Sequence, residues 1–352
     1  SCKLMKALDD KSIDVLNFVK EHPSLSSKEI HDGLTTTLSY ATTKRVLSKL
    51  VTEQLIKTVG IGRGRKYNLD PAYELFYPID VNHYFEKEID ERDIKGSFNL
   101  ALITNILDSV KLFSKEELEY LERLHIDYKN KVAELTDAEY SKELERLAID
   151  LSWKSSQIEG NTYSLLETEL LIKEKQTAKG KGKDEATMLL NHKYALDFII
   201  DHPDYLELLT IARIEDIHSL LVKDLGIDKN VRLRRVGISG TNYTPLDNEH
   251  QIKEALQSMC DLINQRENVF EKTLLLLVLI SYIQPFGDGN KRTARIVSNA
   301  MLIYHGYCPL SFRTIDSIAY KEAMLIFYER NNITAFKDIF INQFAFAVKT
   351  YF

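Results

Sequence analysis

The densest group of residues that could do chemistry lies between Gln284 and Arg295, which read QPFGDGNKRTAR. A glycine-rich loop that leads into a helix can point its backbone N–H groups at an anion, and the helix dipole adds to the attraction. The amides expected to do so are those of Gly287, Gly289, Asn290 and Lys291. Asp288 lies among them, and Mg²⁺ is commonly held by one or two carboxylates together with substrate phosphates. The loop therefore predicts a site for a phosphate-bearing ligand and Mg²⁺.

Two arginines and a glutamine complete this stretch. Arg292 and Arg295 are three positions apart, so on a helix they face the same side and can hold two phosphate groups of one nucleotide. A site of this kind usually also has a group that moves a proton. Gln284 cannot serve, because a neutral amide can only donate and accept hydrogen bonds.

Two apolar segments must position this loop. Residues 271–283 read EKTLLLLVLISYI, an almost wholly apolar pattern that predicts a helix in the centre of a core. Residues 292–307 read RTARIVSNAMLIYHGY and predict a second helix that ends near Gly306. The loop is therefore expected between two buried helices, at the N-terminus of the second.

The composition is that of an ordinary soluble globular protein, with 44% hydrophobic and 28% charged residues in a chain of 352. Glycine and proline are scarce and apolar residues recur at helical spacing, so we expect a mostly α protein with a few short strands. The longest apolar run, Leu274–Ile280, is far shorter than the roughly 20 residues that cross a bilayer. Without a recognisable secretion signal, and with Cys2, Cys260 and Cys308 outside any zinc-site spacing, we expect a cytoplasmic protein with reduced thiols.

The first 72 residues predict a small separate domain. Residues 11–23, 24–34 and 39–56 read as three helices, and residues 56–70 read as a β-hairpin around a Gly-Arg-Gly-Arg turn. This order resembles a winged helix-turn-helix, in which the third helix enters the major groove and the wing touches phosphate. The residues that match such DNA contacts are Thr43, Lys44, Arg45, Lys49, Arg63, Arg65 and Lys66.

The charge distribution is compatible with that interpretation without requiring it. Residues 1–75 hold 12 Lys and Arg against 9 Asp and Glu, a surplus of +3. Because the net charge of the chain is −6, the remaining residues carry −9. A small basic end is compatible with a nucleic-acid partner. Winged helices also serve as protein-interaction modules, and fold does not fix function, so both alternatives stay open.

The stretch from Gln284 to Arg295 resembles the core motif of the Fic family, HPFx(D/E)GNGRxxR. Ten of its twelve positions fit, counting the variable ones. The two departures are Gln284, where the family has His, and Lys291, where it has Gly. The lysine variant is familiar in Fic-like and Doc-like sequences.

A second stretch supports the resemblance. Residues 155–161 read SSQIEGN, which resembles the family's inhibitory motif, [S/T]xxxE[G/N]. Ser155 and Glu159 are four apart and so share one helix face, and Gly160 provides the stop of a helix C-terminus. The resemblance implies that Glu159 pairs with Arg295 and keeps this arginine from holding a γ-phosphate.

A third stretch, Val231–Leu246, resembles the family's flap, a β-hairpin that holds a target segment beside the active site by strand addition. The positions that match by residue type are Arg232, Ile238, Gly240, Tyr243 and Pro245. The whole resemblance covers about residues 145–310.

The resemblance implies transfer of AMP from ATP to a Ser, Thr or Tyr hydroxyl of a target protein. Asp288 would bind Mg²⁺, and the nucleotide would be held by Gly287, Gly289, Asn290, Lys291, Arg292 and Arg295. The general-base histidine of the family is replaced by Gln284, and general-base help is typically worth about 10²–10⁴ in rate. We therefore expect transfer to be weak or lost, unless another group such as His250 or His305 supplies the base.

A different class of function fits the same residues. The chain could be an ATP-sensing transcriptional regulator, with the winged helix as output and a Fic core that binds nucleotide without transfer. A homodimer is a further expectation, and Lys291 keeps open a reversed nucleotide pose with phosphoryl transfer, as suspected for Doc-like members.

The expected fold is mostly α. It has a Fic-type helical bundle core with a short β-hairpin flap, plus a small winged helix domain. The expected boundaries are 1–72 for the winged helix domain, 73–144 for a helical linker, 145–310 for the Fic core with inhibitory helix and flap, and 311–352 for C-terminal helices that pack on the core.

Overall fold

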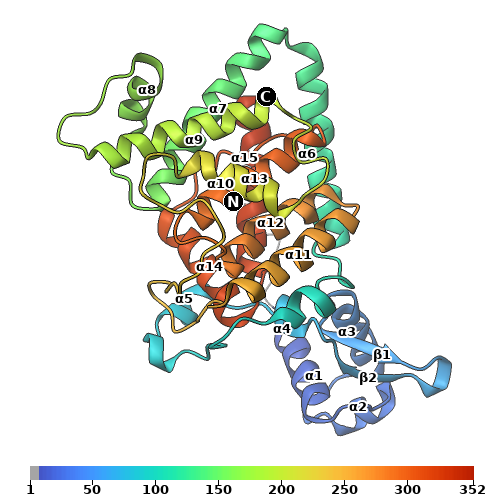
Figure 1. Ribbon diagram of the computed structural model, residues 1–352. Coiled ribbons are helices and arrows are strands. Elements are labelled where there is room, and N and C mark those ends of the chain that lie inside the picture. The colour runs from blue at the N-terminus through green and yellow to red at the C-terminus, as the bar shows by residue number, and fades with distance from the viewer. Residues whose placement is uncertain (1–7) are drawn as a thin grey trace.

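The computed structural model describes residues 8–352, apart from the side chain of Arg63. Cys2 lies outside the described residues. The chain forms a large helical body and a smaller N-terminal unit, which stands at the lower right in Figure 1. Among the described residues the sheet structure is one antiparallel pair of strands, so the prediction of a mostly α fold is confirmed.

The N-terminal unit has the predicted order of elements. It comprises α1 (Asp10–Glu21), α2 (Ser27–Gly33), α3 (Tyr40–Thr52), β1 (Ile56–Val59) and β2 (Lys66–Leu69). Ser26 caps α2, because its side chain accepts a hydrogen bond from the Glu29 amide and Glu29 bonds back to Ser26. The third helix ends at Thr52, four residues earlier than predicted, since the chain then enters the first strand.

The N-terminal unit has a hydrophobic core of its own. Its buried side chains come from all three helices, both strands and the turn before the first strand: Val15, Leu16, Val19, Ile30, Val46, Leu47, Leu50, Leu55, Ile56 and Tyr67. Phe76 packs against this core and also against the main core of the body. The unit therefore joins the body through the segment that follows its second strand.

Short helices connect the unit to the body. They are α4 (Tyr73–Phe76) and α5 (Val81–Phe85), followed by a π-helical turn over Leu102–Ile106. The Asn332 side chain donates to the carbonyls of Glu74 (2.7 Å) and Tyr77 (2.6 Å), and the Ile333 amide donates to Leu75 O (3.0 Å). These bonds fasten α4 to residues 331–333, between the last two helices of the chain.

The body is built from long helices. They are α6 (Lys115–Glu134), α7 (Asp137–Ile158), α8 (Leu165–Glu174), α9 (Lys183–Asp201), α10 (Ile211–Leu221), α11 (Glu249–Gln265), α12 (Val269–Ile283), α13 (Asn290–Tyr304), α14 (Ser317–Arg330) and α15 (Thr334–Tyr351). In Figure 1, α6 and α7 form a tall pair at the top, and α8 projects to one side. Of the helices described, each is too short or too polar to span a bilayer.

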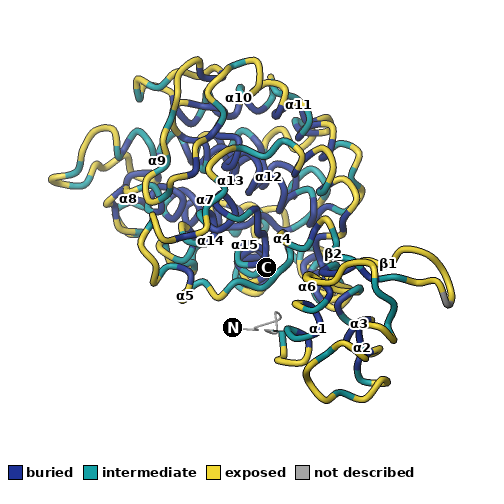
Figure 2. The backbone as a smooth tube through the Cα atoms, turned by 90° about the horizontal axis from the view of Figure 1, so that it is seen from below, coloured by how far each residue is buried: buried dark blue, intermediate teal, exposed yellow. Residues whose placement is uncertain are grey.

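The helices α12 and α13 form the centre of the body. Fourteen residues of α12, from Val269 to Ile283, are buried, and Figure 2 shows both helices within the buried interior. They pack on each other and are surrounded by α9, α10, α11 and α14. The prediction that the motif loop joins two buried helices is confirmed. Cys260 and Cys308 are buried, free thiols.

The predicted β-hairpin of the flap is wrong. All of residues 231–248 are described, and they form extended chain and turns without a strand. Thr244 makes a single parallel bridge to Ser97 instead. The physical reason is that other partners take up backbone groups of this segment: the Arg232 amide donates to Pro285 O (2.9 Å) of the motif loop, and the Arg232 guanidinium donates to the carbonyls of Arg234 and Leu246.

Candidate functional site

The motif loop starts and ends on residues with a left-handed backbone. Gln284 closes α12 with φ 52°, and Gly289 caps the start of α13 with φ 78°. A Cβ added to Gly289 would lie 3.3 Å from His218 Cε1 and 3.4 Å from Arg292 Nη2. Glycine is therefore required at this position for its backbone conformation and for space.

Two polar side chains hold the loop in shape. The Asn290 amide accepts from the Phe286 N–H (2.8 Å) and donates to Phe286 O (2.9 Å). Arg232 is buried, with 6% of its surface exposed, and donates through Nε to Gln284 O (2.6 Å). Arg232, predicted as a target-docking residue, thus supports the motif loop from behind.

The side chain of Gln284 is also used within the loop. Its Nε2 donates to Ser281 O (2.7 Å), and its Oε1 accepts from Asn290 Nδ2 (2.9 Å). The residue is 8% exposed. In this arrangement the amide orients Asn290 and the end of α12, and it has no capacity to take up a proton.

The loop forms one wall of a cavity of about 360 Å³. Gln284 and residues 287–291 line this wall, and Ile158 with Glu159 at the end of α7 line another. Residues 236–239 of the flap segment and residues of α14 (Lys321, Met324, Leu325 and Tyr328) close the remaining sides. The structure thus brings together the loop, the inhibitory motif and part of the flap, which are far apart in sequence.

Asp288 has the exposure expected of a metal ligand. Its side chain is 67% exposed at the cavity, and Oδ2 lies 3.5 Å from Arg292 Nη2. Oδ1 accepts a hydrogen bond from the Gly289 amide (2.6 Å). One hard, accessible carboxylate beside backbone amides fits Mg²⁺ of the kind that shares its ligands with substrate phosphates.

Arg292 is the least satisfied cation of the site. Its side chain is 1% exposed, and neither Nε nor Nη1 finds a hydrogen-bond partner within residues 8–352. Burial lowers the pKa of Arg292, and attraction to Asp288 counters this only in part. A buried guanidinium with free donors can bind an anion strongly, because two donors lack a partner within the described residues and Asp288 balances its charge only in part.

Arg295 is held by the inhibitory motif. It is fully buried, and it donates through Nε to Ser155 Oγ (2.8 Å) and through Nη2 to Ser155 O (3.1 Å) and Glu159 Oε1 (2.8 Å). Glu159 closes α7, and Gly160 follows with φ 98° as the helix stop. Ser155, Glu159 and Gly160 therefore lie in one structural unit with Arg295.

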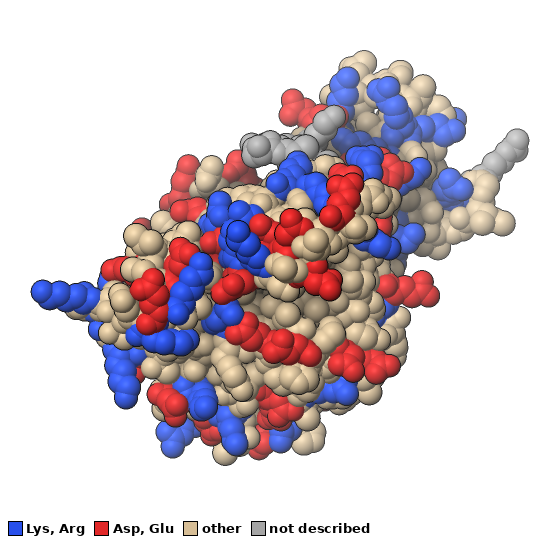
Figure 3. Space-filling model, turned by 90° about the horizontal axis from the view of Figure 1, so that it is seen from above, with Lys and Arg blue, Asp and Glu red and all other residues tan. Residues whose placement is uncertain are grey.

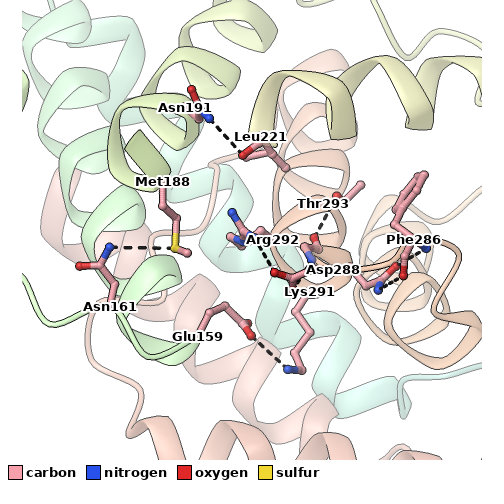
Figure 4. Close-up of polar contacts among 12 residues, drawn as sticks. Glu159, Asn161, Met188, Asn191, Leu221, Phe286, Asp288, Lys291, Arg292 and Thr293 are labelled. Carbon is pink, nitrogen blue, oxygen red and sulfur yellow. Dashed lines mark hydrogen bonds and ion pairs between the residues drawn. The ribbon is translucent and has the colours of Figure 1, made fainter. Parts of the chain in front are cut away.

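Glu159 is bound by a second cation. Figure 4 shows the Lys291 side chain extending toward Glu159, with Nζ 3.1 Å from Oε2. Burial raises the pKa of Glu159, but the attraction of Arg295 and Lys291 outweighs it and holds this pKa at about 2. Each carboxylate oxygen thus faces one positive charge, as the oxygens of a phosphate group would.

A histidine stands behind this cluster. His192 on α9 is fully buried, and its Nε2 lies 2.7 Å from Ser155 Oγ. Burial, with the nearby Arg295 and Arg292, holds the pKa of His192 well below its ordinary value, so the ring is neutral. Ser155 Oγ thus lies between Arg295 Nε, which donates to it, and the neutral His192 ring. The sequence gives no sign of His192, because its partner is 37 residues away.

The flap residues divide between the cavity and the core. Ile238 lines the cavity, and Gly240, with φ 87°, accepts a bond from Arg92 Nη2 (2.9 Å) through its carbonyl. Tyr243 is 3% exposed, and its hydroxyl donates to Tyr282 O (3.0 Å). Tyr243 therefore supports α12 from inside the core. In this conformation it is not accessible to a target protein at the surface.

The two alternative base candidates do not approach the cavity. His250 lies exposed in the first turn of α11, and His305 caps the far end of α13. Neither belongs to the described cavity wall. Lys321 and Tyr328 line the cavity from α14, and no sequence pattern marks them, because only the packing of α14 beside the loop brings them there.

The predicted DNA-binding residues are not equally accessible. Lys44, Arg45 and Arg65 are exposed. Lys49 lies 3.8 Å from Asp9, and Lys66 pairs with Glu29 at 2.8 Å. On the face in Figure 3, acidic and basic side chains are interspersed over the larger body.

The prediction for Thr43 is wrong. Thr43 is fully buried, and its hydroxyl donates to Ser39 O (3.3 Å) and lies 3.2 Å from His31 Nδ1. Its place on α3 repeats with Val46, Leu47 and Leu50 of the core, a helical spacing that marks the inner face.

Known proteins match the chain over this region. Residues 208–302 match the model of the Fic/DOC family. A protein adenylyltransferase Fic of Nematostella vectensis is 26% identical over 253 residues, which cover 68% of this chain and 59% of that protein. The protein adenylyltransferase fic-1 of Caenorhabditis elegans is 24% identical over 163 residues, 44% of this chain and 31% of the relative. The chain thus spans about three fifths and one third of the lengths of these curated relatives.

Solved structures share the fold. A Fic domain containing signaling protein from Bacteroides thetaiotaomicron superposes with a TM-score of 0.57 at 19% identity, over 66% of this chain and 95% of that chain. A Fic family protein from Desulfovibrio desulfuricans gives a TM-score of 0.56 at 17% identity, over 68% and 74%. The match of residues 208–302 to the family model shows a Fic domain in that part of the chain, and the solved structures show that the helical body shares their fold.

Proposed function

We propose that this chain binds ATP with Mg²⁺ and belongs, by function, with the protein adenylyltransferases, which transfer AMP to a hydroxyl of a target protein. The observation that carries this proposal is the cavity in which loop amides, Asp288 and Lys291 meet, with Arg292 buried behind them with free donors. Curated relatives named protein adenylyltransferase support the same reaction class.

Each group of the loop would then have one task. The amides of residues 287–291 and the start of the α13 dipole would hold the phosphate at which the bond breaks. Asp288 would hold Mg²⁺, which when bound neutralises charge that develops on the phosphates. Arg292 and Arg295 would bind the outer phosphates through charge-assisted hydrogen bonds, and positioning of this kind dominates phosphoryl and nucleotidyl transfer.

We further propose that the described conformation is self-inhibited. Arg295 would not bind a terminal phosphate while Ser155 and Glu159 take up its Nε and Nη2 groups and Glu159 balances its charge, although Nη1 has no partner within residues 8–352. Lys291 adds a second bond that must break before the α7 end can withdraw. Nucleotide binding in the productive pose would therefore compete with Glu159 for two cations.

Gln284 sets the expected rate. Without a base, the attacking hydroxyl keeps its proton longer, so transfer would be slower by about 10²–10⁴ than with a well-placed histidine. The amide also has fixed structural partners, Ser281 and Asn290. Binding of nucleotide would be preserved while transfer is slow or lost.

Incubation with Mg²⁺ and ATP labelled at the α-phosphate tests the proposal in three proteins: wild type, Glu159→Gly and Gln284→His combined with Glu159→Gly. Label on protein in Glu159→Gly supports a slow transferase, and label only in the combined variant supports a binding protein that lacks its base. If Glu159→Gly fails to bind ATP by calorimetry, the nucleotide site itself is refuted.

A regulator that binds DNA is a second proposal, favoured by one observation. Lys44 and Arg45 are exposed side by side on α3, the helix that precedes the hairpin of β1 and β2. In a winged helix this helix enters the major groove. The ion pairs of Lys49 and Lys66 reduce the free positive charge of this surface.

A further inference from the structure

Tyr328 brings an unpaired hydroxyl to the cavity. The residue lies on α14, lines the cavity, and is 1% exposed. Within residues 8–352 its hydroxyl has no hydrogen-bond partner. Buried polar groups are nearly always paired, because an unpaired one loses its bonds to water without replacement. An unpaired buried hydroxyl on a cavity wall therefore indicates a bond made with a ligand.

The ring of Tyr328 cannot readily turn away to find another partner. It stacks on Tyr243 of the flap segment, with centroids 5.6 Å apart and planes at 22°, and beside Tyr282 of α12 at 6.3 Å and 20°. Tyr243 is itself fixed by its bond to Tyr282 O. Aromatic packing on this side holds the hydroxyl in one place, which is the preorganisation expected of a binding group.

The hydroxyl lies at the Gln284 end of the cavity. Burial raises the pKa of Tyr328, and the neighbouring side chains of Gln284 and Ser281 lower it only in part. The tyrosine therefore remains protonated at neutral pH and acts as a hydrogen-bond donor. Asn290 Nδ2 donates both of its hydrogens, to Gln284 Oε1 and Phe286 O, and Gln284 Nε2 donates one of its two to Ser281 O. Tyr328 thus presents a free side-chain donor at this end.

We propose that the Tyr328 hydroxyl donates a hydrogen bond to a phosphate oxygen of the bound nucleotide, next to Gln284. This inference rests on the proposed nucleotide site and adds a ligand from outside the motif loop. A phosphate oxygen is the acceptor that the location favours, because the loop amides of residues 287–291 begin three positions from Gln284 and gather the phosphates there.

The test measures affinity for two probes, ATP with Mg²⁺ and inorganic triphosphate with Mg²⁺, by calorimetry. The parent is Glu159→Gly, in which Arg295 is free, and it is compared with Glu159→Gly combined with Tyr328→Phe. Loss of one hydrogen bond to a charged acceptor predicts that both probes bind about tenfold to a hundredfold more weakly. Thermal unfolding without ligand should show an equal or higher Tm, since Phe removes an unpaired buried hydroxyl.

Ser12→Ala in the same parent is the matched control. Ser12 is fully buried in the N-terminal unit and also has a hydroxyl without a partner in the described chain, but it does not line the cavity. It should leave both affinities unchanged. The inference is overturned if Tyr328→Phe leaves triphosphate affinity unchanged, whether or not ATP is weakened, or if both variants weaken binding equally. If the parent binds neither probe, the proposed nucleotide site has failed, and this inference fails with it.

Discussion

Replacing Glu159 with Gln tests the self-inhibited conformation most directly, because it removes one charge and keeps the shape. The pKa of Glu159 is about 2 in the folded chain against an ordinary value of 4.5. Each unit of pKa corresponds to ~1.36 kcal/mol, so the pairing with Arg295 and Lys291 stabilises the folded, closed state by about 3 kcal/mol at pH 7. Only 19% of the side chain is exposed, so solvent screening reduces this value little.

Two measurements should therefore change in opposite directions. The free energy of unfolding of Glu159→Gln, from urea titrations followed by circular dichroism, should fall by about 2–4 kcal/mol. Affinity for ATP with Mg²⁺ should rise, by up to about a hundredfold, because the nucleotide no longer has to displace a carboxylate from Arg295 and Lys291. Glu145→Gln, an exposed acid on the same helix, serves as the control and should change neither quantity.

The pH dependence gives the sign of the effect. A carboxyl whose folded pKa is depressed contributes stability that is complete above its unfolded pKa and is lost as the pH falls through the folded value. The difference in stability between wild type and Glu159→Gln should thus be full above about pH 5 and less than half as large by about pH 3. A gap that stays constant over this range, or a variant that binds ATP more weakly than wild type, would refute the reasoning.

Three further outcomes are expected. Gly289→Ala should lower Tm more than Gly306→Ala, because both have positive φ and cost about 1 kcal/mol in backbone strain, but only the Gly289 Cβ meets neighbours within 3.4 Å. Arg232→Ala should cost about 2–4 kcal/mol in unfolding free energy, since it leaves buried carbonyls of the loop and flap without a donor. If the N-terminal unit binds DNA, Lys44→Ala with Arg45→Ala should reduce the slope of log affinity against log salt by about 2; an unchanged slope would argue against this surface.

The sequence was most informative where function and folding use the same local pattern. The apolar run before Gln284 and the glycines after it predicted a loop between two buried helices, as found. The spacing of Ser155 and Glu159 placed both on one helix face, and the structure directs both at Arg295. The local placement follows in each case from helical periodicity and apolar pattern, which a sequence displays directly, whereas the pairing of Glu159 with Arg295 was implied by the resemblance to the Fic family.

The predictions failed where tertiary contacts decide. Thr43 looked like part of a basic helix face, but its spacing with the core residues of α3 placed it inside, a signal that was available in the sequence. The flap lacks strands because the Arg232 side chain and the Gly96 carbonyl take up its backbone groups, and neither partner is marked by a sequence pattern. The pairing of Lys291 with Glu159, and the position of Tyr328, depend on helices brought together only by folding.

The attachment of α4 has a mechanical consequence. The bonds from Asn332 and Ile333 to α4 lie in the short connection between α14 and α15, and α14 supplies Lys321, Met324 and Tyr328 to the cavity wall. On the other side, the Gln54 side chain donates to Lys111 O (2.7 Å) and ties the end of α3 to the body. A ligand that displaces α14 would therefore either rotate the N-terminal unit about the Gln54–Lys111 bond or break the bonds to α4. Through these bonds α14 couples the cavity to the N-terminal unit.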